Sequence, residues 1–123
     1  MKVLLAEDST AMADLECEVL RRLTHTPLSL IRARDGQEVM ELIKSGEQQV
    51  DLIILDWHMP NCTGLDVLRF IRERDSVTPI LMVTSESKTA SIVRAVNEGV
   101  TEYIVKPFTV KDLSDKVSKY MID

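Results

Sequence analysis

Short aliphatic runs alternate with amphipathic segments along the whole chain. The aliphatic runs lie at residues 2–6, 28–33, 52–55, 79–83 and 102–105. Most of them are continuous, whereas a strand with one face in water usually alternates apolar and polar residues. The runs therefore predict strands that are covered by helices on both faces.

The segments between these runs carry apolar residues at helical spacing. The first segment has Ser9 or Thr10 as its N-cap, and the last one follows Thr109. The middle segments predict helices over 35–45, 63–74 and 88–98, with Gly99 as the C-cap of the third. The apolar positions of the first and last segments are Met12, Leu15, Val19, Leu20 and Leu23, and Val110, Leu113 and Val117.

Strand and helix thus alternate in the order (βα)5. This order predicts an α/β fold, in which a doubly wound parallel sheet has right-handed crossovers and helices on both faces. In such sheets, ligands bind beyond the carboxyl ends of the strands. Polar residues at those ends are therefore the first candidates for function.

Composition adds few constraints to this picture. The chain has 123 residues, 45% of them hydrophobic, and we predict one domain over residues 1–123. The net charge is −5 with acids and bases interspersed, which disfavours nucleic acid as a partner. No apolar run approaches the roughly 20 residues that span a bilayer, so we expect a cytoplasmic protein without membrane insertion.

Charged and hydroxyl side chains follow four of the predicted strands. Each has an ordinary structural alternative: an Asp after a strand often caps a helix, a Thr hydroxyl also caps, and a Lys is often a solvated surface charge. Strand 28–33 is followed only by Asp35 and Gly36, which we interpret as a turn or cap. The candidates at the other strand ends are Glu7 and Asp8, Asp56, Thr84 and Lys106.

Together these side chains predict a phosphate and metal site. Carboxylates gathered at one sheet edge repel one another unless their pKa values rise or a cation neutralises them. Oxygen ligands favour a hard ion, and Mg²⁺ commonly combines one or two carboxylates with waters and phosphate oxygens. A phosphate would also engage the charge of Lys106 and the hydroxyl of Thr84.

Four motifs in this order resemble the receiver domain of two-component response regulators. They are "LLAEDS", "LIILDWHMP" with Gly64 after it, "MVTSES" and "VKPF", and the resemblance covers essentially the whole chain. Within that family the motifs are most similar to the single-domain chemotaxis regulators of the CheY group. The resemblance implies a flavodoxin-like sheet of strand order 2-1-3-4-5, which makes Asp8 and Asp56 neighbours.

The resemblance also implies a role for each candidate. Asp56 is the expected phosphoacceptor, and Thr84 and Lys106 are expected to bind phosphoryl oxygens. Glu7, Asp8, Asp56 and the backbone carbonyl of His58 are the expected ligands of Mg²⁺, which Mn²⁺ can replace. Tyr103 is the expected switch partner of Thr84, although without the resemblance a partly buried core aromatic is the favoured interpretation. The Lys106–Pro107 bond is expected to be cis.

Two further sets of residues follow from the resemblance. His58 and Glu86 flank the route of the attacking water and are expected to tune dephosphorylation. Ile92, Tyr103 and Lys116 match a partner-binding face built by helix 4, strand 5 and helix 5. Packing of helix 4 on the sheet is the alternative for Ile92, since Val93 and Val96 are also apolar.

The implied function is that of a regulator that a histidine kinase phosphorylates and that then binds a target, first of all a flagellar motor switch protein. A phosphatase is a further expected partner, and we expect no enzymatic activity beyond self-phosphorylation and dephosphorylation. A phosphorelay shuttle, a receiver excised from a larger regulator and a phosphorylation-independent interaction domain remain alternatives. A P-loop hydrolase is disfavoured, because "AEDSTAMAD" lacks the glycines of that loop.

Overall fold

The computed structural model describes residues 1–46 and 49–121 and contains one parallel sheet of five strands. The strand order is β2-β1-β3-β4-β5, which confirms the predicted α/β doubly wound topology. Buried aliphatic residues form the central strands, whereas β2 lies at an edge and is only partly covered. The strands are β1 Lys2–Ala6, β2 Ser29–Ala33, β3 Leu52–Leu55, β4 Ile80–Thr84 and β5 Glu102–Val105.

Helices α1, α2, α3 and α5 begin where a side chain caps them, whereas α4 begins without a side-chain cap. The hydroxyl of Ser9, rather than that of Thr10, accepts a bond from the Met12 amide at the start of α1. Asp35 caps α2 in the same way, as predicted, and Thr109 forms a capping box with Asp112 at α5. The helices are α1 Thr10–Leu23, α2 Gly36–Ser45, α3 Gly64–Arg72, α4 Thr89–Asn97 and α5 Val110–Ser118.

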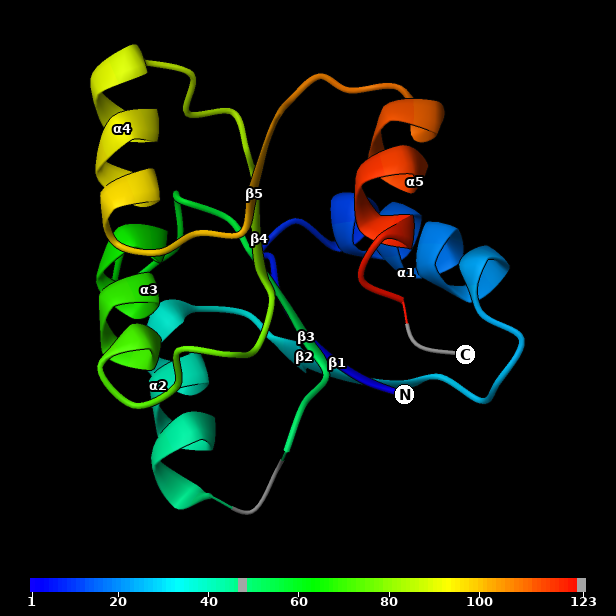
Figure 1. The fold of residues 1–123 in the computed structure, drawn as a ribbon, viewed down its shortest axis with the longest axis horizontal. Coiled ribbons are helices and arrows are strands. Elements are labelled where there is room, and N and C mark those ends of the chain that lie inside the picture. The colour runs from blue at the N-terminus through cyan, green and yellow to red at the C-terminus, as the bar shows by residue number, and fades with distance from the viewer. Residues whose placement is uncertain (47–48, 122–123) are drawn as a thin grey trace.

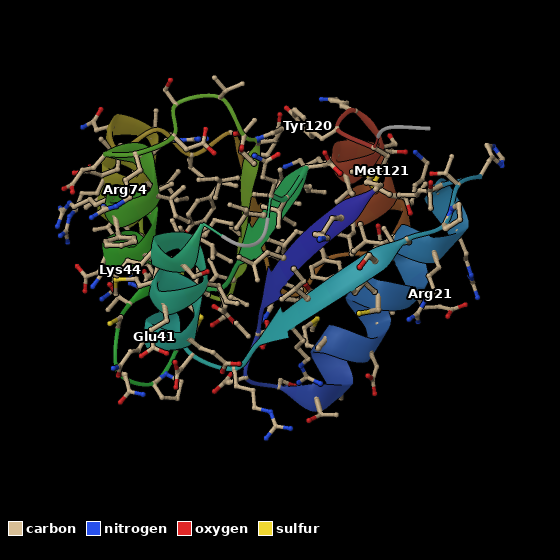
Figure 2. All side chains as sticks on the ribbon, turned by 90° about the horizontal axis from the view of Figure 1, so that it is seen from below. Arg21, Glu41, Lys44, Arg74, Tyr120 and Met121 are labelled. Carbon is tan, nitrogen blue, oxygen red and sulfur yellow. The ribbon has the colours of Figure 1, made fainter. Side chains whose placement is uncertain are left out.

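The helices cover the sheet in two layers (Figure 1). Helices α1 and α5 lie on one face, over an apolar cluster that includes Val3, Leu5 and Val83. Helices α2, α3 and α4 lie on the other face, over a cluster that includes Leu4, Ile53 and Met82. Figure 2 shows this sandwich from below, with α1 and α2 on opposite sides of the sheet. Within the described residues, no helix is long and apolar enough to cross a membrane.

The sheet register brings the predicted site residues to one edge. Ala6 pairs with Leu55, so Glu7 and Asp56 continue adjacent strands directly beyond the sheet. Thr84 pairs with Val105, and it is the last residue of β4 instead of lying beyond it. The Lys106 amide extends this ladder by donating to the Thr84 carbonyl at 2.8 Å. Residues that are far apart in sequence thus meet at the carboxyl ends of β1, β3, β4 and β5.

The predicted apolar stripe of α1 was partly wrong. Leu15 is 37% exposed, whereas Ala13 and Glu16 point into the interior with Val19 and Leu20. The predicted positions and the observed ones both fit helical spacing, because adjacent stripes on one helix share residues. As a result the buried side of α1 includes Glu16, which the predicted apolar stripe did not contain.

Candidate functional site at the carboxyl edge of the sheet

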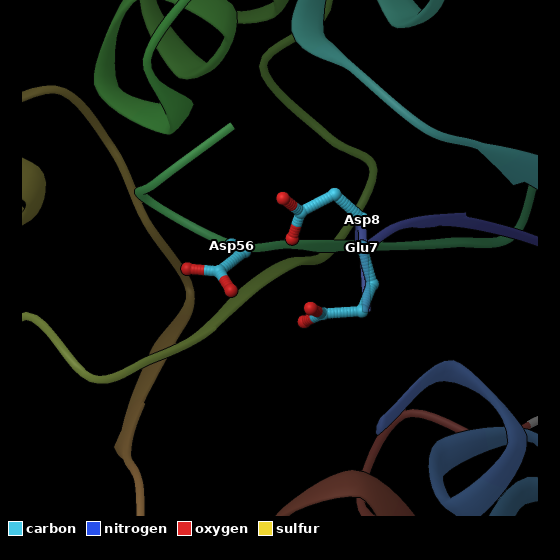
Figure 3. A group of neighbouring side chains, drawn as sticks. All are labelled: Glu7, Asp8 and Asp56. Atoms are coloured by element: carbon cyan, nitrogen blue, oxygen red, sulfur yellow. The ribbon is translucent and has the colours of Figure 1, made fainter. Parts of the chain in front are cut away.

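Three carboxylates meet beyond β1 and β3 (Figure 3). One oxygen from each of Glu7, Asp8 and Asp56 lies within 4.8 Å of the other two. Glu7 and Asp56 are buried, whereas Asp8 is exposed and opens the cluster to solvent. Asp8 and Asp56 are therefore neighbours, as the predicted strand order implied.

Lys106 holds two of these carboxylates together. Its ammonium nitrogen lies 2.9 Å from Glu7 Oε2 and 2.9 Å from Asp56 Oδ2. The lysine side chain is 16% exposed, so this is a shielded ion pair and not a solvated surface charge. Burial opposes ionisation of the ammonium, but the bonds to Glu7 and Asp56 raise the pKa of Lys106 above its ordinary value.

The two buried carboxylates respond differently to the same surroundings. Burial disfavours the ionised form of Asp56, yet hydrogen bonds from Thr84 and Lys106 hold its pKa below the ordinary value. The His58 amide adds a further bond to Asp56 Oδ1 at 3.1 Å. For Glu7, burial outweighs the bonds from Lys106 and the Ser9 amide, so its pKa is raised. The same surroundings thus favour the ionised form of Asp56 and disfavour that of Glu7.

The cluster fits a hard divalent cation. Its donors are all carboxylate oxygens, they come from three side chains, and Asp8 leaves one side open for waters or phosphate oxygens. These are the features of a Mg²⁺ site, which uses few protein carboxylates and keeps part of its hydration shell. Lys106 partly neutralises Glu7 and Asp56, so an arriving cation competes with the ammonium for the same oxygens.

Local backbone geometry presents Asp56 at this position. The Gly64 amide donates to the Trp57 carbonyl at 2.7 Å and folds the start of α3 back over the end of β3. A Cβ at position 64 would collide with the Asp56 carbonyl oxygen, so the close approach requires glycine. In the same loop, Asn61 has a φ of 73° and donates to Asp35 at 2.9 Å. These contacts fix the loop that carries Asp56.

Thr84, Glu86 and Tyr103 form a second connected group beside the carboxylates. The Glu86 amide donates to the Thr84 hydroxyl at 3.2 Å, and the Tyr103 hydroxyl donates to the Glu86 carbonyl at 2.6 Å. Tyr103 is partly buried, and burial raises its pKa to about 12. A movement of Thr84 would therefore reach Tyr103 through Glu86. The Lys106–Pro107 bond at the end of β5 is cis, as expected.

His58 and Glu86 approach each other across the mouth of the site. His58 Nε2 lies 3.3 Å from Glu86 Oε1, and the imidazole is 59% exposed. This contact connects the loop after β3 to the loop after β4, directly outside Asp56 and Thr84. The two residues expected to flank the phosphoryl group thus lie together.

The proposed partner face differs in detail from the prediction. Ile92 is partly buried, not exposed, while Val93 and Val96 are 50% and 59% exposed. Ala95 faces the interior, and Ile92 lies one turn before it on the same side of α4, so Ile92 is partly buried as well. Lys116 is also partly buried, and its ammonium donates to the Tyr103 carbonyl at 3.3 Å.

The sequence interpretation missed one charged residue near the site. Glu16 on α1 is 1% exposed, and its strongest electrostatic neighbours are Glu7, Lys106 and Asp56. Burial, together with the charge of Glu7, raises the pKa of Glu16 to about 8. Its spacing from Ala13 and Val19 was the available signal, since residues three apart share a helix face.

Comparison with known proteins gives consistent matches. The family model described as response regulator receiver domain matches residues 3–118. The chemotaxis protein CheY of Pseudomonas aeruginosa is 39% identical over 97% of this chain and 94% of its own length. CheY-3 of Vibrio cholerae is 36% identical over 97% of this chain and 90% of its own length.

Solved structures match equally well. The chemotaxis response regulator CheY4 of Vibrio cholerae superposes with a TM-score of 0.81 at 29% identity, and the match covers 98% of both chains. The Mn²⁺-bound form of the response regulator Rcp1 superposes with a TM-score of 0.82 at 27% identity, covering 96% of this chain and 89% of that one.

Proposed function

This chain belongs to the response regulator receiver domain family, and we propose that it is a phosphorylation-dependent switch whose phosphoacceptor is Asp56. The observation that carries the proposal is the contact of Lys106 with Asp56 at 2.9 Å beside Glu7 and Asp8. It supports the proposal because a buried carboxylate with a lowered pKa lies beside an ammonium and two further acids, a set that suits a cation and an anionic phosphoryl group. The phosphodonor that we propose is the phosphohistidine of a histidine kinase.

The chemistry follows from the positions of these side chains. An Asp56 oxygen forms a bond to phosphorus while the bond from phosphorus to the donor nitrogen breaks, and the imidazole leaves with the electron pair. Mg²⁺, held by Glu7, Asp8, Asp56 and the His58 carbonyl, or Mn²⁺ in its place, would offset the repulsion between the anionic donor and the anionic nucleophile. Lys106 and Thr84 would bind phosphoryl oxygens as a charge and a hydroxyl donor. The protein catalyses this reaction only on itself.

Phosphorylation would be transmitted through the Thr84, Glu86 and Tyr103 connection. Thr84 is bonded to the Glu86 amide, which must respond if the hydroxyl moves to a phosphoryl oxygen. Tyr103, which is bonded to the Glu86 carbonyl, would then change the face formed by α4, β5 and α5. Val93 and Val96 give that face apolar contact area, and Ile92 and Lys116 border it.

A flagellar motor switch protein is the target we propose first, because CheY proteins of Pseudomonas and Vibrio match nearly the whole chain. A phosphorelay shuttle is the second candidate, and a cytoplasmic location suits both. His58 and Glu86, in contact across the mouth of the site, would tune the lifetime of the phosphoryl group or the access of a phosphatase. A phosphorylation-independent interaction domain would have no use for the bridged carboxylates.

The deciding experiment measures intact mass after incubation with acetyl phosphate and Mg²⁺. We expect one phosphoryl adduct in the wild type, no adduct without the metal, and no adduct in Asp56→Asn. Asp14→Asn, an exposed position on α1, is the matched control and should form the adduct normally. A full adduct in Asp56→Asn would refute the assignment of the phosphoacceptor. No adduct in a folded wild type would favour the phosphorylation-independent domain.

A further inference from the structure

Glu16 has no role in the proposed chemistry, yet the structure buries it almost completely. It is 1% exposed, and neither carboxyl oxygen has a hydrogen-bond partner among residues 1–46 and 49–121. Buried polar side chains nearly always have a partner, because an unpartnered one costs folding free energy. A buried carboxyl without a donor therefore requires an explanation.

The position of Glu16 gives a direction for that explanation. It lies on the sheet-facing side of α1, in the layer that α1 shares with α5. Figure 3 shows the Glu7 side chain extending toward this layer, away from Asp8. The charges that act most strongly on Glu16 are those of Glu7, Lys106 and Asp56. Glu16 thus lies in the layer toward which Glu7 extends, and the charges of the site act on it.

Lys106 is the donor that could reach an inner acceptor. An ammonium has three N–H bonds, and its contacts with Glu7 and Asp56 account for two of them. A cation that binds Glu7 and Asp56 draws on the same two carboxylates and so weakens these bonds. The ammonium then needs another acceptor, either water outside the site or a protein oxygen inside it.

We propose that Glu16 is a positioning residue for Lys106, which accepts a hydrogen bond from the ammonium when a divalent cation engages Glu7 and Asp56. This inference rests on the proposed function, because it assumes that the carboxylate cluster binds Mg²⁺. The inner acceptor keeps the ammonium beside Asp56 during metal binding, so that it remains within reach of a phosphoryl oxygen. Without it, the displaced ammonium would have no protein acceptor, so metal binding would be weaker and Lys106 would turn outward into solvent once the metal is bound.

The role requires an acceptor oxygen and not a negative charge. Burial raises the pKa of Glu16 to about 8, so at neutral pH most molecules carry it as a neutral acid with a carbonyl oxygen. Glutamine reproduces that oxygen at nearly the same size. Leucine fills the same space without an acceptor and suits the apolar layer, so neither variant should impair folding.

The test is a Mg²⁺ titration followed by the fluorescence of Trp57, which adjoins Asp56. Glu16→Leu removes a hydrogen bond to a charged group, and we expect this loss to raise the Kd for Mg²⁺ about tenfold. Glu16→Gln should stay within about twofold of the wild type, since it keeps the acceptor. Val19→Ala is the matched control, because it opens a cavity in the same buried stripe and leaves Glu16 in place.

A second readout follows the ammonium itself. In ¹⁵N spectra of wild type and Glu16→Gln, the Lys106 Nζ signal should remain protected from solvent exchange when Mg²⁺ is added. In Glu16→Leu it should broaden or vanish on addition of the metal. If Glu16 only supported the fold, the Lys106 Nζ signal would respond to Mg²⁺ in the same way in both variants.

The outcomes separate this inference from the proposed function. If the wild type binds Mg²⁺ and forms the Asp56 adduct while Glu16→Leu binds Mg²⁺ equally well, the role of Glu16 is refuted and the proposed function stands. An equal loss of affinity in Val19→Ala would also refute it, because general destabilisation would explain both variants. A folded wild type that neither binds Mg²⁺ nor forms the adduct would overturn both proposals.

Discussion

Two buried carboxyl groups in neighbouring regions of this protein have opposite electrostatic states. Asp56, at the carboxyl edge of the sheet, is 6% exposed, and Glu16, in the layer beneath α1, is 1% exposed. Burial acts against ionisation of both, but bonds from Thr84, Lys106 and the His58 amide lower the pKa of Asp56. Among the described residues Glu16 has no such donor, and burial raises its pKa to about 8.

The comparison shows that hydrogen-bond donors can offset the effect of burial on a carboxylate, as they do at Asp56 although not at Glu7. At the sheet edge, strand ends supply an ammonium, a hydroxyl and a free backbone amide within reach of one side chain. In the middle of α1, the backbone amides are already used within the helix, and none of the described side chains donates to Glu16. The edge of a parallel sheet can therefore hold reactive charge that its helix layers cannot.

The largest predicted effect is on the pH dependence of stability, through Glu16. Its pKa is raised from 4.5 in the unfolded chain to about 8 in the fold. Its contribution to the free energy of unfolding is therefore complete below pH 4.5 and is lost as the pH rises toward 8. Linkage makes this loss about 4 kcal/mol over the whole window. Glu16→Gln should remove that part of the slope, and urea unfolding at pH 5 and pH 8 without Mg²⁺ measures it.

Glu18→Gln provides the control for this measurement. Glu18 lies on the exposed side of the same helix and pairs with Arg22 at the surface. It should keep the slope of the wild type. If Glu16→Gln also kept that slope, the contrast between the two buried carboxyl groups would be wrong.

An intermediate effect on stability is expected when Asp56, like Glu16, is left without a charged donor. Lys106→Met removes the ammonium and leaves Glu7 and Asp56 without their shared partner. Loss of one member of a shielded ion pair should cost about 2 kcal/mol of unfolding free energy, less than for a fully buried pair because Asp8 opens the cluster to water. Urea unfolding without metal measures this cost, and added Mg²⁺ should recover part of it. Equal stability of variant and wild type would contradict the bridging role of Lys106.

The smallest effect is expected at the mouth of the site. His58→Ala removes the contact with Glu86, but the imidazole is 59% exposed and solvent screens the pair. We expect no measurable change in the urea midpoint, together with a changed decay rate of the Asp56 adduct followed by intact mass. A midpoint shift comparable to that of Lys106→Met would show that the pair contributes to the fold as the buried bridge does.

The fold could be predicted because its signals are local and repeated. Continuous aliphatic runs, helical spacing and cap residues such as Asp35 and Thr109 specify each element within a few neighbours. Errors were confined to places where local signals are degenerate. The stripe of α1 was displaced onto Leu15, and helices predicted over 63–74 and 88–98 are shorter, because flanking residues fit a helix without being needed in one.

The sequence by itself determined which chemical groups lie at the strand ends, since Glu7, Asp8, Asp56, Thr84 and Lys106 all interrupt or follow apolar runs. Only the tertiary structure decided how these groups act on one another. The Lys106 bridge, the His58 contact with Glu86 and the isolation of Glu16 join residues from different elements. Ionisation depends on such through-space neighbours and on burial, and neither is encoded in the local pattern of the chain.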